Sequence, residues 1–446
     1  MNPEVVQRHA APVPRYTSYP TAPHFSDRVQ ESVFRSWLAA LSADARLSLY
    51  FHIPYCTQLC WYCGCNTKET RKYEPVESYM EPLLAEVRNV AALVPAGHRV
   101  THIHWGGGSP NILSAADIRR LADATRAGFN LGSGVEYAVE IDPRTLEAEQ
   151  VTAWAEAGVN RVSLGVQDFE PAVQDAINRQ QSYETTKAAV DMFRAHGIGS
   201  VNIDLVYGLP HQTVESVART IEQVLTLRPD RIAIFGYAHL PARLKHQRLI
   251  KDETLPGIME RYEQSQRIAQ RLAQAGYDAV GLDHFALPQD RLAGEELKRN
   301  FQGYTTDTAE ALIGLGASAI SQLPQGFAQN ATATGEYERR IREKGLATAR
   351  GIALSEDDRV RGYVIERLMC DFTFSAADLE QRFPGNAAKA VIAEAQEVMA
   401  TDRDGFVQRT GDGFVVTTAG RPFVRTICAR FDTYLGTKAA QHAIAV

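Results

Sequence analysis

The sequence predicts an α/β protein built on a parallel sheet, and three observations lead to this fold class. Between about residues 47 and 282, short runs of β-branched and aromatic residues alternate with segments of helical period, as in repeated βα units. The junctions EAGVNRV, AHGIGSV and QAGYDAV share one pattern, with Gly158, Gly197 and Gly276 where helices should end. These glycines lie about one and two βα units apart. Such regularity favours a barrel or partial barrel, with an open doubly wound sheet as the alternative.

The expected elements follow in chain order. The strands are expected at residues 47–54, 100–105, 136–141, 161–165, 200–208, 231–238 and 277–282. Amphipathic stretches such as 76–90, 115–129 and 214–227 are the expected helices between them. In a barrel, the working residues lie at the carboxyl ends of the strands.

Different patterns flank this region. An arm before the first strand contains VPRYTSYPTAP, which is too rich in proline for regular structure and too aromatic for a flexible tail, so we expect it to pack on the protein. After about residue 350, helical segments precede a hairpin with its turn at residues 411–413. We therefore expect a small, mainly helical C-terminal domain. The expected divisions are 1–46 (arm, a candidate substrate lid), 47–290 (barrel), 291–350 (connecting segment that completes the cofactor site) and 351–446 (C-terminal domain).

The composition excludes several classes of protein. The chain has 446 residues, with 47 Lys and Arg against 53 Asp and Glu, so its net charge is only −6 and evenly spread. A nucleic-acid-binding protein would normally carry a basic stripe or tail. Neither a long apolar run nor the apolar core of a signal peptide is present, which predicts a cytoplasmic protein without a membrane span. Without apolar heptads, a monomer is expected.

Four of the six cysteines, Cys56, Cys60, Cys63 and Cys65, lie within ten residues, directly after the first expected strand. The spacing C-x3-C-x2-C-x-C is too compressed for the paired ligands of a structural zinc site, and disulfides are disfavoured in the cytosol. An iron–sulfur cluster fits this spacing better. A zinc or electron-transfer site is the alternative. The remaining two cysteines, at positions 370 and 428, are isolated and are expected to be buried thiols.

Polar residues follow the next expected strands. The glycine run WGGGSP at 105–110 would let the backbone approach a small polar ligand, or it is simply a tight turn. Acidic or amide side chains end two further strands and could bind ligand hydroxyls, act as acids or cap helices. Asp204 lies in an apolar strand and needs a partner such as Arg or a ligand hydroxyl. Arg179 is a candidate cation for a carboxylate. The strand-end residues are Glu140, Asp142, Gln167 and Asp168.

The first three cysteines match the C-x3-C-x2-C signature of the radical S-adenosylmethionine superfamily, which this sequence resembles. The resemblance implies that three thiolates hold a [4Fe-4S] cluster whose fourth iron binds S-adenosylmethionine. Longer strings extend it, including RYTSYPTAPHF, SLYFHIPYCTQLCWYCGCN, HWGGGSPN, VEIDPRT, NIDLVYGLPHQT and CARFDTYL. Over essentially the whole chain, they resemble the oxygen-independent coproporphyrinogen III oxidase (dehydrogenase) family.

That resemblance implies a radical S-adenosylmethionine partial (β/α)6 barrel of the TIM type. It implies an enzyme of haem biosynthesis that converts the ring A and B propionates of coproporphyrinogen III to vinyls, giving protoporphyrinogen IX. An electron donor such as flavodoxin or ferredoxin and an unidentified electron acceptor are also implied. The alternative is a related haem chaperone, which typically lacks the RYTSYPT arm and the fourth cysteine, both present here. A radical methyltransferase and a scaffold protein are further alternatives.

The family's site residues map onto this sequence position by position. The implied cluster ligands are Cys56, Cys60 and Cys63. Two S-adenosylmethionine molecules are implied. The positions for the first are Tyr50, Gly107, Glu140 and Ile320. Those for the second are Tyr62, Gly108, Ser109, Gln167, Arg179, Asp204 and Ala238, with Cys65 beside it and off the cluster. Two positions depart from the usual pattern, because Ser109 replaces Thr and Tyr62 replaces Phe.

Overall fold

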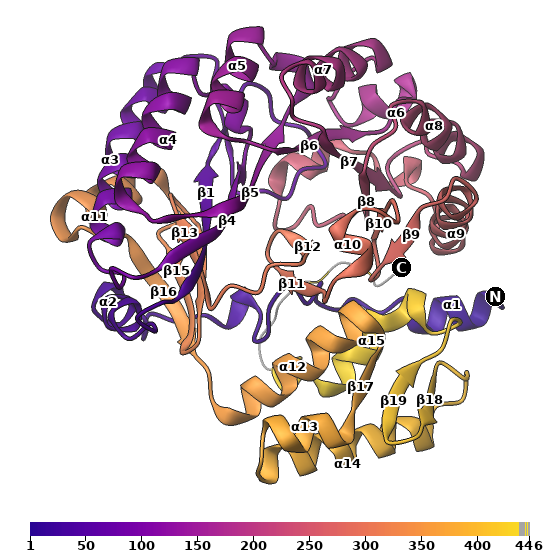
Figure 1. Ribbon diagram of the computed structural model, residues 1–446. Coiled ribbons are helices and arrows are strands. Elements are labelled where there is room, and N and C mark those ends of the chain that lie inside the picture. Colours follow the sequence, from indigo (N-terminus) through magenta and orange to yellow (C-terminus); the bar gives the residue numbers. More distant parts are fainter. Residues whose placement is uncertain (437–441, 443, 445–446) are drawn as a thin grey trace.

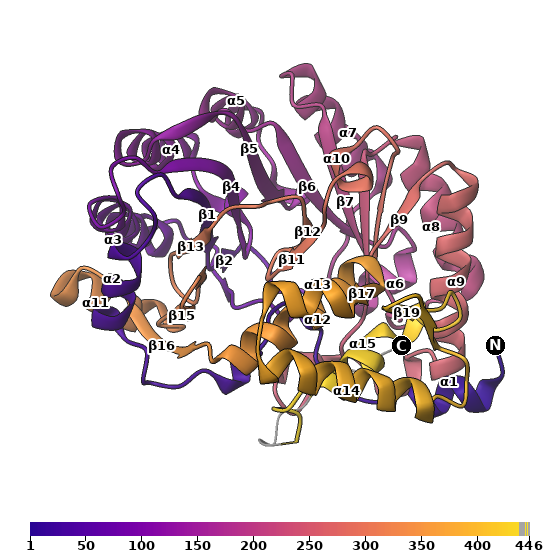
Figure 2. The ribbon, with the colours of Figure 1, turned by 60° about the horizontal axis from the view of Figure 1, so that its bottom comes forward.

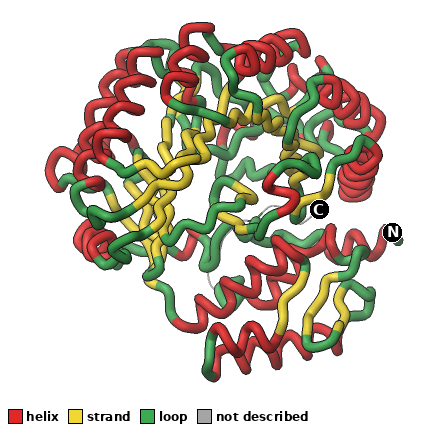
Figure 3. The backbone as a smooth tube through the Cα atoms, viewed as in Figure 1, coloured by secondary structure: helices red, strands yellow, loops and turns green. Residues whose placement is uncertain are grey.

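The computed structural model describes residues 1–436, 442 and 444. Its main feature is a twelve-stranded sheet that curves into an incomplete barrel, with helices on the outer side (Figure 1). Figure 3 shows the strands gathered inside a ring of helices. The order of neighbouring strands is β16-β15-β14-β13-β1-β4-β5-β6-β7-β8-β10-β9.

Six parallel strands form the middle of the sheet, side by side in chain order. They are β1 (Arg46–Ile53), β4 (Arg99–Gly107), β5 (Leu131–Ile141), β6 (Arg161–Gln167), β7 (Ser200–Tyr207) and β8 (Arg231–Gly236). Each overlaps an expected strand. Sequential order is the arrangement of a barrel, whereas a doubly wound sheet reverses direction at a switch point. The predicted partial (β/α)6 barrel is therefore confirmed.

The outer helices begin and end where the sequence provides caps. Ser114, Ser182 and Thr213 each accept a backbone N–H from the first turn of the helix that follows. The three glycines expected at helix ends have positive φ angles of 93°, 81° and 85°. The helices are α3 (Glu74–Ala91), α4 (Ala115–Gly128), α5 (Ala148–Ala157), α6 (Pro171–Ala176), α7 (Tyr183–Ala195), α8 (Val214–Thr226) and α9 (Ile258–Gln274).

The prediction of a seventh strand at 277–282 is wrong in its extent. Only β9 (Asp278–Val280) forms there, and it pairs antiparallel with β10 (His284–Ala286), which pairs antiparallel with β8. The reason is local, because the chain reverses at Gly281, which has a φ of 56°. A Cβ at Gly281 would lie 2.1 Å from the Tyr304 ring. The parallel part of the barrel therefore ends at β8.

On the opposite edge, the sheet continues beyond β1 with strands that the βα alternation did not predict. Strand β13 (Ala311–Leu315) pairs parallel with β1, and β14 (Ile320–Leu323), β15 (Gly326–Asn330) and β16 (Thr348–Ala353) add an antiparallel meander. Helix α11 (Thr334–Lys344) connects the last two. Shorter elements precede them: α10 (Arg291–Gly294), β11 (Lys298–Asn300) and β12 (Gly303–Thr305).

The arm and the C-terminal domain lie across the open side of the barrel (Figures 1 and 2). Helix α1 (Pro3–His9) contacts α9 and pairs with the C-terminal domain through His9 and Asp404, 2.8 Å apart. The Tyr16 hydroxyl donates to Asp432 at 3.1 Å. Helix α2 (Glu31–Ala39) follows and leads into β1. The arm is thus packed against the protein over its length.

The C-terminal domain has its own apolar core, centred on residues such as Leu368, Phe414 and Phe431. Its predicted hairpin is β18 (Val407–Thr410) and β19 (Gly413–Val416), with a third strand, β17 (Thr373–Ser375), beside it. Its helices are α12 (Glu356–Asp371), α13 (Ala376–Arg382), α14 (Asn386–Thr401) and α15 (Val424–Cys428). The expected mainly helical character is confirmed. In the described part of the chain, every helix is too short or too polar to span a bilayer.

A buried carboxylate joins α3 to the meander. Glu86 is 2% exposed and accepts hydrogen bonds from the Gly316 N–H, the Asn330 amide and the Tyr337 hydroxyl, each at 2.7 Å. We expect Glu86→Leu to lower the free energy of unfolding by roughly 3 to 5 kcal/mol, because three buried donors lose their acceptor. Urea unfolding measures this loss. The exposed Glu77 on the same helix is the control, and equal midpoints for Glu77→Leu and Glu86→Leu would contradict the account.

Candidate active site

The four clustered cysteines lie on a loop at the carboxyl end of β1. Two short paired strands, β2 (Tyr55–Cys56) and β3 (Lys68–Glu69), close this loop. The backbone N–H of Trp61 donates to the Ile177 carbonyl at 2.9 Å, which ties the loop to the end of α6. Cys60 is buried, Cys56 and Cys63 are half-buried and Cys65 is exposed, and all are free thiols.

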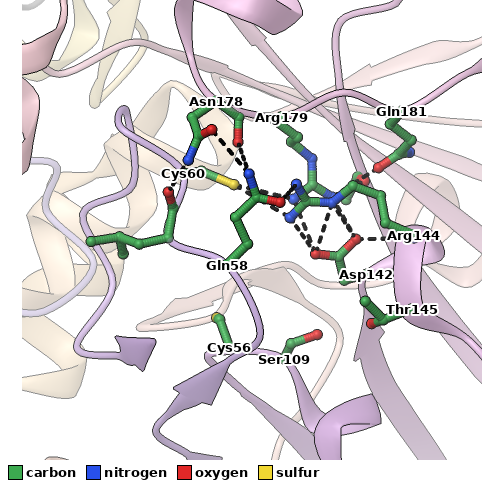
Figure 4. Close-up of polar contacts among 12 residues, drawn as sticks. Cys56, Gln58, Cys60, Ser109, Asp142, Arg144, Thr145, Asn178, Arg179 and Gln181 are labelled. Carbon is green, nitrogen blue, oxygen red and sulfur yellow. Dashed lines mark hydrogen bonds and ion pairs between the residues drawn. The ribbon is translucent and has the colours of Figure 1, made fainter. Parts of the chain in front are cut away.

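Two arginines lie beside the buried thiol (Figure 4). Arg144 and Arg179 each donate to the Cys60 sulfur at 3.5 Å. Both also pair with Asp142, at 2.6 Å and 3.3 Å respectively. Burial opposes ionisation of Asp142, but the positive charges of Arg179 and Arg144 outweigh it and lower the pKa of Asp142 to about 2. This side of the loop therefore carries net positive charge beside a cysteine.

The thiols themselves differ in acidity. A hydrogen bond from Cys65 overcomes the effect of burial and lowers the pKa of Cys63 to about 7. Burial raises the pKa of Cys56 to about 12, while the Thr67 hydroxyl lies 3.2 Å from its sulfur. A metal ligand must be a thiolate, so metal binding has to displace the Cys56 proton.

The glycine run passes too close to its neighbours for any side chain. A Cβ at Gly107, where φ is 111°, would lie 2.6 Å from the His52 ring. A Cβ at Gly106 would lie 2.6 Å from the Glu140 carboxylate, and one at Gly108 would lie 2.4 Å from the Tyr55 carbonyl oxygen. The sequence therefore places glycines where the end of β4 forms a backbone-lined wall facing β1 and β5.

The four residues expected at the first S-adenosylmethionine site lie on neighbouring strands. Glu140 accepts from the Gly107 N–H at 3.2 Å and pairs with His104 at 3.0 Å. Burial opposes ionisation, but the His104 hydrogen bond lowers the pKa of Glu140. The rings of Tyr50 and His104 are 5.9 Å apart.

Ile320 lies at the start of β14, in the meander, close to the same group. Tyr50 pairs in register with Gly314, and a Cβ at Gly314 would lie 2.7 Å from the Ile320 carbonyl oxygen. The structure therefore brings β1, β4, β5 and β14 together at this position. His52 belongs to the same group, although the sequence did not single it out. Its Nδ1 lies 3.1 Å from the Tyr50 hydroxyl.

Tyr62 of the second site lies on the cysteine loop, and the other residues expected there lie between the end of β4 and the segment after β8. Ser109 donates to Asn111 at 2.8 Å, and Gln167 is buried with a positive φ of 71°. Arg179 also donates to the Gly165 carbonyl at 2.6 Å. A single buried amide, Gln247, donates to the carbonyls of both Tyr62 and Ala238 at 3.0 Å. The segment after β8 therefore holds the two ends of this set together.

Asp204 has different partners from those expected. The Ser163 hydroxyl donates to it at 2.6 Å and the Asn202 amide at 2.7 Å. Its hydrogen-bond partners among the described residues are therefore neutral groups, and no arginine is one of them. Burial raises the pKa of Asp204. The carboxylate of Asp168 accepts the Glu170 N–H at 2.6 Å, just before α6, and the Thr220 hydroxyl at 3.1 Å, which favours the structural role among its alternatives.

Some residues of the site gave no signal in the sequence. His246 Nε2 lies 2.7 Å from the Cys63 carbonyl, and Gln247 joins Tyr62 to Ala238. Both belong to a short 3-10 helix, Lys245–Leu249. Arg144 is part of the VEIDPRT string, and its spacing two residues after Asp142 could have indicated an ion pair.

Comparison with known proteins agrees with this geometry. Residues 50–224 match the model of the Radical SAM superfamily, and residues 354–423 match the HemN C-terminal domain. The oxygen-independent coproporphyrinogen III oxidase of Bradyrhizobium diazoefficiens is 46% identical, over 97% of this chain and 97% of the relative. The protein of the same name from Paracoccus denitrificans is 46% identical, over 98% and 97%.

A solved structure is also similar. It is coproporphyrinogen III oxidase (HemN) from Escherichia coli, described as a radical SAM enzyme. The TM-score is 0.90 at 42% sequence identity, and the match covers 94% of this chain and 98% of that chain. The similarity thus extends over nearly the whole of both chains.

Proposed function

The chain belongs to the oxygen-independent coproporphyrinogen III oxidase family, and we propose that it performs this family's reaction with the residues described above. The substrate is coproporphyrinogen III, and the reaction turns the ring A and B propionates into vinyls. For each propionate, the β-carbon loses a hydrogen atom, the carboxylate leaves as CO2 and one electron passes to an acceptor. The observation that carries the proposal is the cysteine loop at the barrel's carboxyl end, beside the Gly106–Gly108 wall.

The residues present fit a [4Fe-4S] cluster with S-adenosylmethionine. Three thiols of one loop, Cys56, Cys60 and Cys63, are the donor type that iron–sulfur clusters require. When bound, the cluster and S-adenosylmethionine supply radical hydrogen abstraction, which acid–base side chains cannot perform on an unactivated carbon. Arg144 and Arg179 offset the negative charge of the Cys60 thiolate.

We assign two S-adenosylmethionine molecules to the two groups of residues. The first contacts Tyr50, Gly107, Glu140 and Ile320. The second contacts Tyr62, Gly108, Ser109, Gln167, Arg179, Asp204 and Ala238, with Cys65 beside it. Glu140 supports this assignment, because its ionised carboxylate suits an ammonium group. Gln247 positions Tyr62 against Ala238.

We also propose that the arm, residues 1–46, excludes water during the reaction. The Arg15 guanidinium donates to the Gly236 carbonyl at the end of β8, at 2.9 Å, so the arm already crosses the carboxyl end of the barrel. Residues 291–350 contribute Ile320 to the first group. The electron donor, which would be flavodoxin or ferredoxin, the unidentified electron acceptor, the cytoplasmic location and the monomeric state stay predictions from the sequence.

An anaerobic assay tests the proposal. Reconstituted protein is incubated with S-adenosylmethionine, a reductant, coproporphyrinogen III and a cell extract that supplies the electron acceptor. We expect protoporphyrinogen IX and 5′-deoxyadenosine together. The alternative, a haem chaperone, is not favoured by relatives that carry the enzyme's name. Tight haem binding without vinyl formation would nevertheless support the chaperone and contradict the proposal.

A further inference from the structure

A cavity of about 220 Å³ lies between the barrel, the arm and the C-terminal domain. Its walls come from the ends of β7 and β8, from α9, from the turn before β10, and from the segment around α15. Figure 1 shows α1 and α15 below β9 and β10, on the open side of the barrel. Arginines from four separate parts of the chain line the cavity: Arg15, Arg261, Arg299, Arg421 and Arg425.

In the described part of the chain, Arg15, Arg261 and Arg299 are not matched by an equal number of acidic groups. Among the described lining residues, Asp283 is the one carboxylate, and it already pairs with His284 at 2.8 Å. Its nearest arginine contact is Arg299, at 3.7 Å. Burial opposes ionisation of Asp283, but Arg299 and His284 outweigh it and lower its pKa. Around Asp283, the positive charges of these three arginines therefore outnumber the negative charge.

Several donors of these arginines are buried without an acceptor. The side chain of Arg299 is 4% exposed, and its Nε and Nη1 have no hydrogen-bond partner within the described residues. The Nε of Arg261 is buried in the same way, while its Nη2 donates to the Tyr237 carbonyl at 3.0 Å. A buried guanidinium that lacks acceptors is costly. An anion in the cavity would remove this cost.

The arginines also repel one another. Removal from water, and then the positive charges of Arg15 and Arg299, lower the pKa of Arg425 to about 10. Fork-shaped guanidiniums suit carboxylates, which they can bind through paired hydrogen bonds.

The cavity adjoins the candidate active site. Arg15 donates to the Gly236 carbonyl and Arg261 to the Tyr237 carbonyl, directly before Ala238 in the second S-adenosylmethionine group. An anion bound to these arginines could therefore belong to the molecule that reacts beside the cysteine loop.

We propose that this arginine-lined cavity binds propionate carboxylates of the porphyrinogen that are retained in the product. This inference rests on the proposed function, and it deepens it by naming the residues that hold the substrate. The substrate carries a propionate on every pyrrole ring, and those on rings C and D do not react. The cavity is smaller than the roughly 300 Å³ at which pockets for drug-sized ligands begin, so it accepts side chains and not the macrocycle.

The test compares Arg15→Gln and Arg299→Gln with the wild-type holoenzyme. We expect the KM for coproporphyrinogen III to rise about tenfold for each variant, with a smaller change in kcat, since each removes one charge-assisted contact to the substrate. Arg15→Lys should restore much of the loss. Arg28→Gln is the matched control, because Arg28 is exposed on the same arm and does not line the cavity.

A binding measurement separates the cavity from the reaction. The probes are fluorescent coproporphyrin III and its methyl ester, which lacks the negative charges. The wild type should bind the acid more tightly than the ester. In Arg15→Gln, the ratio of the two affinities should fall about tenfold. Arg15 is exposed, so this variant stays informative if Arg299→Gln does not fold.

Unchanged KM values and an unchanged preference for the acid would overturn the inference, even if the wild type forms vinyls. If the wild type forms no vinyls but its preference for the acid depends on Arg15, the proposed function fails and the carboxylate site stands.

Discussion

Cys60→Ser should abolish assembly of the iron–sulfur cluster and, with it, all vinyl formation. Cys60 is the buried thiol of the loop, and both Arg144 and Arg179 donate to its sulfur. A serine hydroxyl is a much poorer ligand for cluster iron than a thiolate. After anaerobic reconstitution, the absorbance near roughly 400 nm from thiolate-ligated iron should be lost. We expect the same result for Cys56→Ser and for Cys63→Ser.

Cys65→Ser is the matched control, because Cys65 lies on the same loop and is not assigned as a ligand. This variant should assemble a full cluster and yet lose vinyl formation, since the residue lies beside the second S-adenosylmethionine group. A full cluster in any of the three ligand variants would contradict the ligand assignment. A missing cluster in Cys65→Ser would show that the fourth thiol is a ligand as well.

Arg179→Met should reduce vinyl formation by about 100-fold or more while the cluster still assembles. The side chain is buried, pairs with Asp142 at 3.3 Å and donates to the Cys60 sulfur. Its loss removes a charged contact from the second S-adenosylmethionine group, and a buried charge-assisted network loses several kcal/mol when one member is removed. Steady-state kinetics measures the change. Arg179→Lys should recover only part of the activity, because lysine keeps the charge and loses the fork.

Arg179→Met should also change how the stability of the fold depends on pH. In the wild type, the pKa of Asp142 is held at about 2. The ionised carboxylate therefore stabilises the fold fully at pH values above the ordinary pKa of a carboxyl group. This stabilisation is lost as the pH falls towards 2. Without Arg179, the pKa of Asp142 rises and the contribution shrinks. Acid unfolding should therefore begin at a higher pH than in the wild type.

Arg88→Met, on the exposed face of α3, is the control for both measurements and should match the wild type. If Arg179→Met matched this control in activity and in acid unfolding, Arg179 would be a structural residue of the loop and not part of the site.

The parallel half of the barrel could be predicted because its signal is repeated. Each of the six parallel strands, β1 and β4 to β8, has a run of buried apolar residues, and Gly158, Gly197 and Gly276 end helices at corresponding positions with positive φ angles. The meander from β13 to β16 carries no such repeat, because short turns join β13, β14 and β15, and a helix, α11, follows only the last of these three strands. Strand β10, with three residues, is too short for any periodic signal.

In the candidate site too, features with a local sequence signal could be predicted and features without one could not. The cysteine spacing and the glycine run are local patterns, so they pointed to chemistry before the fold was known. Gln247 donates to the Tyr62 carbonyl across 185 residues of sequence, and Arg299 contacts the backbone of Arg15 across 284. Contacts of this kind form only when distant segments meet in the fold, and each residue alone is an ordinary polar side chain. Sequence reasoning could therefore find the cysteine loop but not the residues that we propose to hold the substrate.

The most direct measurement is anaerobic turnover of coproporphyrinogen III deuterated at the β-carbons of its propionates. If this chain is the oxidative decarboxylase described here, deuterium will appear in 5′-deoxyadenosine, and protoporphyrinogen IX and CO2 will form in the same reaction. If S-adenosylmethionine is cleaved without deuterium transfer, and the porphyrinogen is recovered with its propionates intact, the central claim is contradicted.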